Sequence, residues 1–347
     1  MELLQSGLWL PRDVHCVERR EHTLLVAENV VLQVDSKAAS AVASVVSALH
    51  AGSTLRKIVD LVGLERARQI LSTLQEHGWL VLEQDCRERG GQFEQVIGWL
   101  ASCTARPFTI WNRLRRCQVA IVGVGGIGAL LAEHLVAAGV GNLVLIDGDR
   151  VALTNLNRQY LYDHQSVDRL KVQAARERLS ARNPEVKIVV HAHFATQPSD
   201  LACLDDEPVD ILVNCADQPH DLLAVIEGYC KSRALAFTSA GVGLHRGTWG
   251  PLIVPGQTIS QASFDSALGG TAPSVAELLG GPLPCRSSFG PYNSIIASFL
   301  AADVLLYLGG LAAPETLGRQ RMLDFRSLKI TTFPAMAPHV RPTRSKQ

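Results

Sequence analysis

The 347-residue sequence has no excess of charge of either sign and few aromatic residues. Lysine plus arginine equals aspartate plus glutamate at 33 each, and phenylalanine, tryptophan and tyrosine together make up 5% of the chain. This neutrality argues against nucleic-acid binding through bulk charge. Hydrophobic residues make up 47%, enough for large buried cores, so we expect a globular protein with two or three domains.

Paired cysteines and export signals are also missing. The eight cysteines are scattered with no C-x-x-C pair, which argues against a disulfide framework and a paired-cysteine zinc site. The N-terminus lacks the basic start and long apolar core of a signal peptide. The longest apolar run, 295–308, is interrupted by Asp303 and is short for a bilayer, so we expect a buried helix there. These absences favour a cytoplasmic protein without a membrane segment.

The most informative stretch runs from Val119 to Gln159. A short β-branched strand leads into a glycine cluster, an amphipathic helix and a second apolar strand that ends at Asp147. Glycines let the backbone approach a phosphate, and a helix N-terminus offers free N–H groups and a positive dipole end. An acidic residue at the end of the second strand can hold a ribose hydroxyl. We therefore predict a nucleotide site at Asp147 and at the loop glycines Gly123, Gly125, Gly126 and Gly128.

Strands and helices continue to alternate as far as about Ser239. The expected strands are 186–191, 209–215 and 235–239, and the expected helices are 168–183 and 218–233. This alternation predicts the α/β class, with a Rossmann-like doubly wound sheet that places its chemistry at the strand ends. Beyond it we expect an antiparallel strand at 247–255, a helix at 289–309, and one or two strands within 320–333.

Polar side chains gather just after these strands or in the first turns of the helices. They are Asp149, Asn155, Asn157, Arg158, Gln159, Lys171 and Asp217. Two fixed cations and a carboxylate that can hold Mg²⁺ suit attack at a nucleotide phosphate. A substrate carboxylate is already ionised at neutral pH and needs no general base, so ATP would yield an acyl-adenylate and pyrophosphate. Alternatively, Lys171 is an ordinary helix lysine and Asp217 a helix N-cap.

Together these motifs resemble the E1-like adenylating enzymes of the ThiF/MoeB type, which include activators of ubiquitin-like and sulfur-carrier proteins. The likeness rests on VGVGGIGALLAEHLVAAGVGNLVLIDGDRVALTNLNRQ, on DRLKVQAARERL and on NCADQ, with later echoes in GPLIVPGQT and FGPYNSIIASFLAADVLLYLGG. It covers roughly residues 117–330. An NAD-dependent oxidoreductase would explain the glycines and Asp147 but not the residues that follow.

The resemblance implies roles for the polar residues. Asp147 would bind the adenosine ribose and Asp217 the magnesium ion, whereas Asp149 and Asn155 would belong to the nucleotide site. Asn157, Arg158 and Lys171 would contact the triphosphate and stabilise charge at the α-phosphate, and Gln159 would support the same loop. Arg158, Lys171 and Asp217 are the expected catalytic residues.

The resemblance also implies a homodimer, and it has two departures. Arg89 is the candidate for the arginine that the partner subunit would extend to the ATP phosphates. Where many family members carry a zinc-binding C-x-x-C pair, this chain has Ser260 and Ser263, so we expect no zinc. No cysteine is evident for thiol transfer. Cys285 is the one candidate, and Cys215 fits a small core residue.

The N-terminal 85 residues have a different pattern. We expect two strands within 23–34, helices at 37–51, 54–62 and 64–77, and a strand at 78–82, which together have a winged-helix look. The last helix sets Arg66 and Arg68 against Glu65 and Glu76, so it lacks a basic face for DNA phosphates. The pattern resembles instead the peptide-clamp domain that binds an extended leader peptide along an edge strand.

These features predict four segments and a function. They are a leader-binding domain at 1–85, a helical connection at 86–116, an E1-like domain at 117–335 with a mobile substrate loop at about 256–288, and a polar tail at 336–347. The combination resembles the E1-like enzymes that modify the ribosomally made precursor peptides of pantocin A and microcin C. We therefore expect ATP- and Mg²⁺-dependent adenylation of precursor-peptide carboxylates on glutamate side chains, followed by cyclisation with loss of water. The alternatives are AMP attachment to the peptide C-terminus, activation of a ubiquitin-like or sulfur-carrier protein, and a non-catalytic scaffold.

Overall fold

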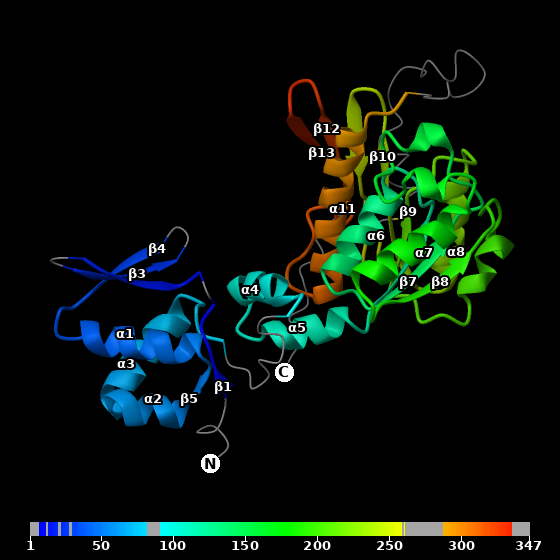
Figure 1. The fold of residues 1–347 in the computed structure, drawn as a ribbon. Helices are drawn as coiled ribbons and strands as arrows, with labels where there is room; N and C mark the ends of the chain where they lie inside the picture. The colour runs from blue at the N-terminus through cyan, green and yellow to red at the C-terminus, as the bar shows by residue number, and fades with distance from the viewer. Residues whose placement is uncertain are drawn as a thin grey trace. The chain divides into compact units, whose positions relative to one another are not determined.

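The fold was analysed in a computed structural model that describes residues 7–11, 13–19, 22–27, 30–81, 91–258, 260 and 287–334. The chain divides into two compact units, Met1–Arg113 and Leu114–Gln347 (Figure 1). Arg89, Ser263, Cys285, most of the expected substrate loop and the polar tail lie outside the described residues.

The N-terminal unit combines a small antiparallel sheet with a group of helices. Strands β2 (His15–Glu18), β3 (Thr23–Ala27) and β4 (Val30–Val34) form one sheet in that order, and β1 (Gly7–Leu8) pairs with β5 (Ser53–Thr54). The helices are α1 (Ala39–His50), α2 (Leu55–Val62), α3 (Leu64–Glu76), α4 (Glu94–Cys103) and α5 (Pro107–Leu114). Apolar side chains of β3, α1, α2 and α3 share one buried core.

Most of the elements expected in this unit are present. β3 and β4 occupy the predicted 23–34 stretch, and α1, α2 and α3 match the three predicted helices within two residues. Thr54 caps α2 by accepting from the Lys57 N–H at 3.3 Å. Of the predicted strand at 78–82, residues 78–81 are described, and they pair through a single antiparallel bridge between Val81 and Trp9. Leu82 lies outside the described residues.

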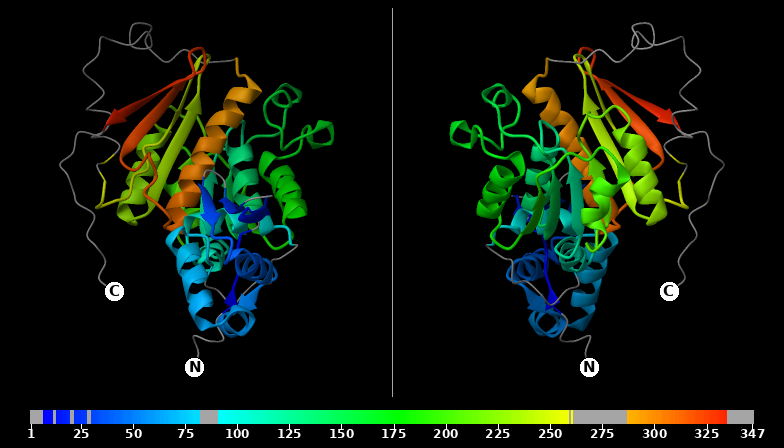
Figure 2. Two further views of the ribbon diagram at one scale, coloured as in Figure 1. Left: turned by 90° about the vertical axis from the view of Figure 1, so that its left-hand side faces the viewer. Right: turned by 90° about the vertical axis from the view of Figure 1, so that its right-hand side faces the viewer.

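The second unit is built on an eight-stranded sheet with the order β13-β12-β11-β10-β9-β6-β7-β8. The parallel part comprises β6 (Gln118–Val122), β7 (Asn142–Ile146), β8 (Lys187–His191), β9 (Ile211–Asn214) and β10 (Ala236–Val242). Strands β11 (Arg246–Trp249), β12 (Arg319–Asp324) and β13 (Lys329–Pro334) continue it antiparallel, and Figure 2 shows the red β12–β13 hairpin at the sheet's edge.

Helices cover both faces of this sheet. Alternate residues of β6 point to opposite sides, so Val119 and Ile121 pack in one core with α6 (Gly128–Ala137), α7 (Lys171–Arg182) and α11 (Gly290–Gly309). Ala120 and Val122 pack on the other side with α8 (Leu222–Ser232) and a short 3₁₀ helix at Pro198–Leu204. The doubly wound α/β fold predicted from the alternation is confirmed. The order in which strands are added reverses between the parallel strands β6 and β9, and such sheets bind ligands at this switch point.

Two helix starts were predicted too early. α7 begins at Lys171, because Asp168 has a left-handed φ of 65° and residues 168–171 pair with the backbone of residues 149–151. α8 begins at Leu222, so Asp217 lies in the turn between β9 and that helix. Lys171 therefore stands at the first position of its helix, and Asp217 stands in a loop after a strand end.

Helix α11 is long and apolar enough to cross a membrane by length and composition. In this fold it packs against α6, β10 and β11, and half of its most apolar window is buried. Asp303, inside the helix, is itself buried and accepts a hydrogen bond from Thr316 Oγ1 at 2.7 Å. These contacts give α11 the character of a core helix, as expected from the sequence.

Candidate functional site

The glycine loop between β6 and α6 forms a tight turn that tolerates no side chain at two positions. Gly123 has a φ of 87°, and a Cβ on it would lie 2.7 Å from the Ala216 backbone nitrogen. A Cβ on Gly128 would lie 1.9 Å from the Gly123 carbonyl oxygen. Only glycine fits these positions, so the loops after β6 and β9 can meet at the switch point of the sheet, where the strand order reverses.

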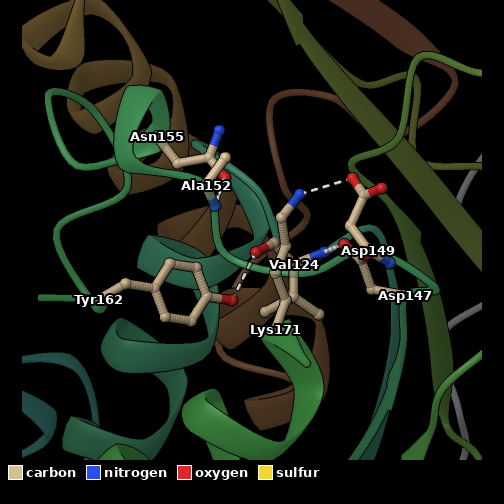
Figure 3. Close-up of polar contacts among 7 residues, drawn as sticks. All are labelled: Val124, Asp147, Asp149, Ala152, Asn155, Tyr162 and Lys171. Carbon is tan, nitrogen blue, oxygen red and sulfur yellow. Dashed lines mark hydrogen bonds and ion pairs between the residues drawn. The ribbon is translucent and has the colours of Figure 1, made fainter. Parts of the chain in front are cut away.

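Asp147 is buried at the end of β7 and binds backbone on two sides. Its Oδ2 accepts from the Val124 N–H at 2.7 Å, and its Oδ1 accepts from the Asp149 N–H at 2.8 Å (Figure 3). The predicted ribose-binding carboxylate is thus already fixed against the glycine loop. Since a carboxylate can accept several hydrogen bonds, acceptor capacity remains for a ribose hydroxyl.

Two residues that the motif analysis did not single out also hold the loop. The buried Tyr162 hydroxyl donates to the Val124 carbonyl oxygen at 2.7 Å (Figure 3). Burial, together with the charges of Asp147 and Asp149, keeps the pKa of Tyr162 well above its usual value, so the hydroxyl remains a donor. Asn293 of α11 is buried against Gly126, with its Oδ1 3.0 Å from the position of a Gly126 Cβ. Both contacts join positions distant in sequence, and the one available signal was the position of Asn293 at the start of an otherwise apolar helix.

Lys171 and Asp149 form an ion pair next to the loop. The Lys171 Nζ donates to Asp149 Oδ2 at 2.7 Å, and the lysine side chain is 7% exposed whereas that of Asp149 is 53% exposed. The Lys171 N–H also donates to the Asp149 carbonyl oxygen at 2.9 Å. A buried ammonium held by one half-exposed carboxylate is not an ordinary surface lysine, which weakens the structural alternative for Lys171.

The segment after Asp149 folds into compact turns that carry the predicted amide cluster. Asn155 Oδ1 accepts from the Ala152 N–H at 3.0 Å. Arg158 donates to the Thr154 carbonyl oxygen at 2.8 Å and to Asn157 Oδ1 at 3.1 Å, and its side chain is half-buried. These bonds hold the guanidinium of Arg158 along its own turn.

Gln159 is buried beneath the glycine loop. Its Nε2 lies 3.6 Å from the position that a Cβ on Gly125 would occupy, and its Oε1 is buried with no hydrogen-bond partner in the structure. The predicted supporting residue therefore contacts the loop.

Asp217 stands apart from these contacts. It is exposed and directly follows Ala216, whose N–H donates to Asn214 Oδ1 at 3.1 Å. Because Ala216 touches Gly123, the carboxylate of Asp217 follows directly on the loop–loop contact. Cys215 is enclosed there, and burial raises the pKa of its thiol to about 12, as a small core residue requires. That thiol is protonated at neutral pH and is a poor nucleophile.

The arrangement fits a magnesium–nucleotide complex. Among the described residues, the N–H groups of Gly125 and Gly126 donate to no protein acceptor, so they are free to donate to phosphate oxygens. No group of three or more histidine, cysteine, aspartate or glutamate side chains is gathered for a metal ion in the part of the chain described. One carboxylate such as Asp217 is nevertheless enough for Mg²⁺, which takes further ligands from phosphates and water.

A doubly wound sheet with a glycine loop, a buried aspartate and a buried lysine at its switch point defines a nucleotide-binding α/β protein. The model of the ThiF family matches residues 107–344, so the chain belongs to this family of E1-like adenylating enzymes. Curated relatives include ubiquitin-like modifier-activating enzyme 5 of Gallus gallus, 32% identical over 68% of this chain and 60% of its own length. The same enzyme of Branchiostoma floridae is 32% identical over 67% of this chain and 58% of its own. The chain thus spans about 60% of the length of these relatives.

Solved structures with a similar fold match a larger share of the chain. E. coli MccB in complex with MccA-N7isoAsn has a TM-score of 0.76 at 21% identity, covering 95% of this chain and 97% of MccB. MccB with ATP gives a TM-score of 0.75 at 22% identity over the same shares. Selenomethionine PaaA gives 0.71 at 21% identity, covering 93% of this chain and 98% of PaaA. At these identities the likeness establishes the fold.

Proposed function

We propose that this protein uses ATP and Mg²⁺ to adenylate a carboxylate of a ribosomally made precursor peptide. The observation that carries the proposal is the buried Lys171 ammonium beside the loop that Asp147 and Tyr162 hold (Figure 3). A fixed cation, free loop N–H groups and the half-buried Arg158 are suited to charge at an α-phosphate. Belonging to the ThiF family favours this chemistry over hydride transfer.

The proposed reaction needs little from the protein besides position and charge. A carboxylate oxygen of the peptide attacks the α-phosphorus of ATP, and the bond to the β-phosphate oxygen breaks, so that acyl-adenylate and pyrophosphate form. Lys171 and Arg158 would stabilise the charge at that phosphate. Bound at Asp217, Mg²⁺ would neutralise the leaving phosphates. A backbone amide nitrogen then attacks the activated carbonyl carbon, AMP leaves and the nitrogen loses its proton, which closes a ring.

A peptide substrate is favoured by the N-terminal unit. Strand β4 lies at one edge of the β2-β3-β4 sheet. Within the described part of the chain it pairs with β3 on one side only, so the N–H and C=O groups of its other side can pair with an added strand. Val31, on β4, is 60% exposed and offers an apolar contact to such a strand. The fold likeness to MccB and PaaA covers this unit too, whereas the curated activating enzymes match about two thirds of the chain. MccB has been observed with ATP and with MccA, which supports a similar pairing here.

Three further parts of the proposal come from the sequence. The family resemblance suggests a homodimer in which Arg89 reaches the partner's ATP, the pattern of residues 1–85 suggests leader binding, and the lack of an export signal suggests a cytoplasmic location. We also propose that glutamate side chains are the activated carboxylates. Sedimentation would test the dimer directly.

The test is to incubate the protein with ATP, Mg²⁺ and the small peptide encoded beside its gene, and to weigh the peptide afterwards. Loss of one or two water molecules supports cyclisation, whereas a gain of AMP supports the route that retains the nucleotide. An unchanged peptide mass, with no AMP released, would contradict both. A heat-treated enzyme sample is the control for spontaneous dehydration.

Activation of a ubiquitin-like protein is the second candidate, because the curated relatives are named for it. In that case a folded protein with a Gly-Gly C-terminus would be adenylated and the precursor peptide would not. Offering both substrates in one reaction, with each product weighed, separates the two functions.

A further inference from the structure

Tyr162 contacts the glycine loop at one carbonyl oxygen and is otherwise enclosed in the core. Its side chain is 5% exposed and packs with residues of β6, α6 and α7. The hydroxyl donates to the Val124 carbonyl oxygen at 2.7 Å (Figure 3). Val124 is itself fully buried, and its N–H donates to Asp147 Oδ2 at 2.7 Å. Both polar backbone groups of Val124 are therefore occupied by side chains from outside the loop.

This arrangement decides which amide of the loop can meet a phosphate. The Val124 N–H is used by Asp147 and cannot serve. The Val124 carbonyl and the Gly125 N–H belong to the same trans peptide group, so they point in opposite directions. With the carbonyl directed into the core at Tyr162, the Gly125 N–H is directed away from Tyr162, and it donates to no acceptor within the described part of the chain.

We propose that Tyr162 is a positioning residue for ATP, whose hydroxyl fixes the Val124–Gly125 peptide group so that the Gly125 N–H faces the nucleotide phosphates. The proposal rests on the function proposed above and extends it to a residue that touches no substrate. Without the hydroxyl, the Val124 carbonyl loses its partner in a dry environment and the peptide group is free to rotate. The high pKa that burial imposes on Tyr162 keeps the donor protonated across the physiological range.

The decisive comparison uses two buried tyrosines, one at the glycine loop and one away from it. Tyr229 is 3% exposed, and its hydroxyl donates to Asp205 at 2.8 Å in a partly buried hydrogen bond. Tyr162→Phe and Tyr229→Phe each remove one hydroxyl hydrogen bond, so both are expected to lower thermal stability. Only Tyr162→Phe is expected to change the nucleotide site.

Calorimetric titration of the full chain with ATP and with adenosine supplies the readout. Adenosine carries the base and ribose but no phosphate. Tyr162→Phe is expected to weaken ATP binding about five- to tenfold and to leave adenosine binding unchanged, because one hydrogen bond to phosphate is lost. Tyr229→Phe should change neither. Unchanged ATP affinity in Tyr162→Phe, or an equal loss for ATP and adenosine, would overturn the assignment.

Amide hydrogen exchange without nucleotide separates this inference from the proposed function. The Val124 N–H is bonded to Asp147 Oδ2 and adjoins the peptide group that Tyr162 holds, so this amide is expected to exchange faster in Tyr162→Phe than in the wild type or in Tyr229→Phe. If the wild type bound no ATP, the proposed function would fail, whereas the exchange comparison would still report on the peptide group. Equal Val124 exchange in all three proteins would refute the positioning role by itself.

Discussion

Lys171 is the residue on which the proposed charge stabilisation depends most. Its ammonium is buried and paired with Asp149, whose own carboxylate is half-exposed. We expect Lys171→Met to lower kcat/KM for adenylation by about 100- to 1000-fold, the range seen when one donor to a developing charge is removed. The exposed Lys187 of β8 is the matched control, and Lys187→Met should retain full activity. Pyrophosphate release measures both, and equal activities would remove Lys171 from the site.

Asp217 is expected to separate turnover from leader binding. Asp217→Asn removes the carboxylate proposed for Mg²⁺, so pyrophosphate release should fall to background while leader-peptide affinity stays at the wild-type value. Asp221, also exposed and four residues on, provides the control Asp221→Asn, which should act like the wild type. Fluorescence polarisation of a labelled leader follows binding. Parallel loss of binding and turnover would contradict the modular arrangement.

The sequence predicted the part of the site that is contiguous in the chain. The glycines, Asp147 and the residues up to Gln159 follow one another in the first βαβ unit, and their local pattern indicates their position. Tyr162 and Asn293 escaped notice because their roles come from tertiary contacts, with Val124 and Gly126 respectively. No local pattern marks such residues, since a partner distant in sequence leaves no trace in the residues beside them.

Among the elements, the start of α6 has a strict steric requirement. A Cβ at position 128 would lie 1.9 Å from the Gly123 carbonyl oxygen, which is backbone and cannot swing aside. Gly128→Ala should therefore destabilise the second unit by about 1–3 kcal/mol and abolish ATP binding. Gly228 of α8 has open space, so Gly228→Ala is expected to stabilise by about 0.4–1 kcal/mol. Urea unfolding compares the two; a Gly128→Ala protein with wild-type stability and ATP affinity would contradict this view of the turn.

Helix α11 carries a pH-dependent contribution to stability at Asp303. Burial raises the pKa of this carboxyl, which accepts from Thr316 Oγ1. The folded state then binds the proton more tightly than the unfolded chain, so this group stabilises the fold below its unfolded pKa of about 3.9, and the contribution is lost as pH rises through the folded pKa.

Asp303→Asn keeps an acceptor for Thr316 and removes the titration. As pH rises from about 4 to about 7, the unfolding free energy of the wild type should therefore fall relative to that of the variant. Urea titrations at several pH values give that difference directly. A difference that does not vary with pH would show that Asp303 does not titrate anomalously.

Element identity was predictable from periodicity, and some element boundaries were not. The α7 start depends on Asp168 at positive φ and on backbone pairing between residues 149–151 and 168–171, which no local pattern reveals. The segment predicted as a strand at 78–82 has a strand-like composition, yet its described residues form one bridge, between Val81 and Trp9. Composition indicates whether a segment favours the β conformation, whereas strand pairing depends on the neighbouring segments in the fold.

At the scale of the whole molecule, we propose that leader binding and adenylation belong to separate units. Val31, at 60% exposure on the edge strand β4, is the contact chosen to test this. Val31→Lys should weaken leader binding at least tenfold, since a charge replaces an apolar contact, and ATP affinity should not change. Val189 is also an exposed valine on an edge strand, β8 of the other sheet, so Val189→Lys is the control and should leave the leader bound. Equal leader affinity in both variants would place the leader elsewhere.

The sequence predicted the class of the large sheet but not the order of its strands. Alternating strands and helices imply a doubly wound sheet, whereas the pairing of β9 with the free edge of β6 depends on tertiary contacts. That choice brings Ala216 against Gly123 and so places Asp217 after the loop contact. The site as a whole therefore depends on topology as much as on motif.

Adenylation is tested most directly by the bond of ATP that the protein breaks when the precursor peptide is present. We predict peptide-dependent formation of AMP and pyrophosphate, together with peptide-dependent exchange of labelled pyrophosphate into ATP in wild-type protein and none in Lys171→Met. Formation of ADP and phosphate, or AMP formation that does not depend on the peptide, would contradict it.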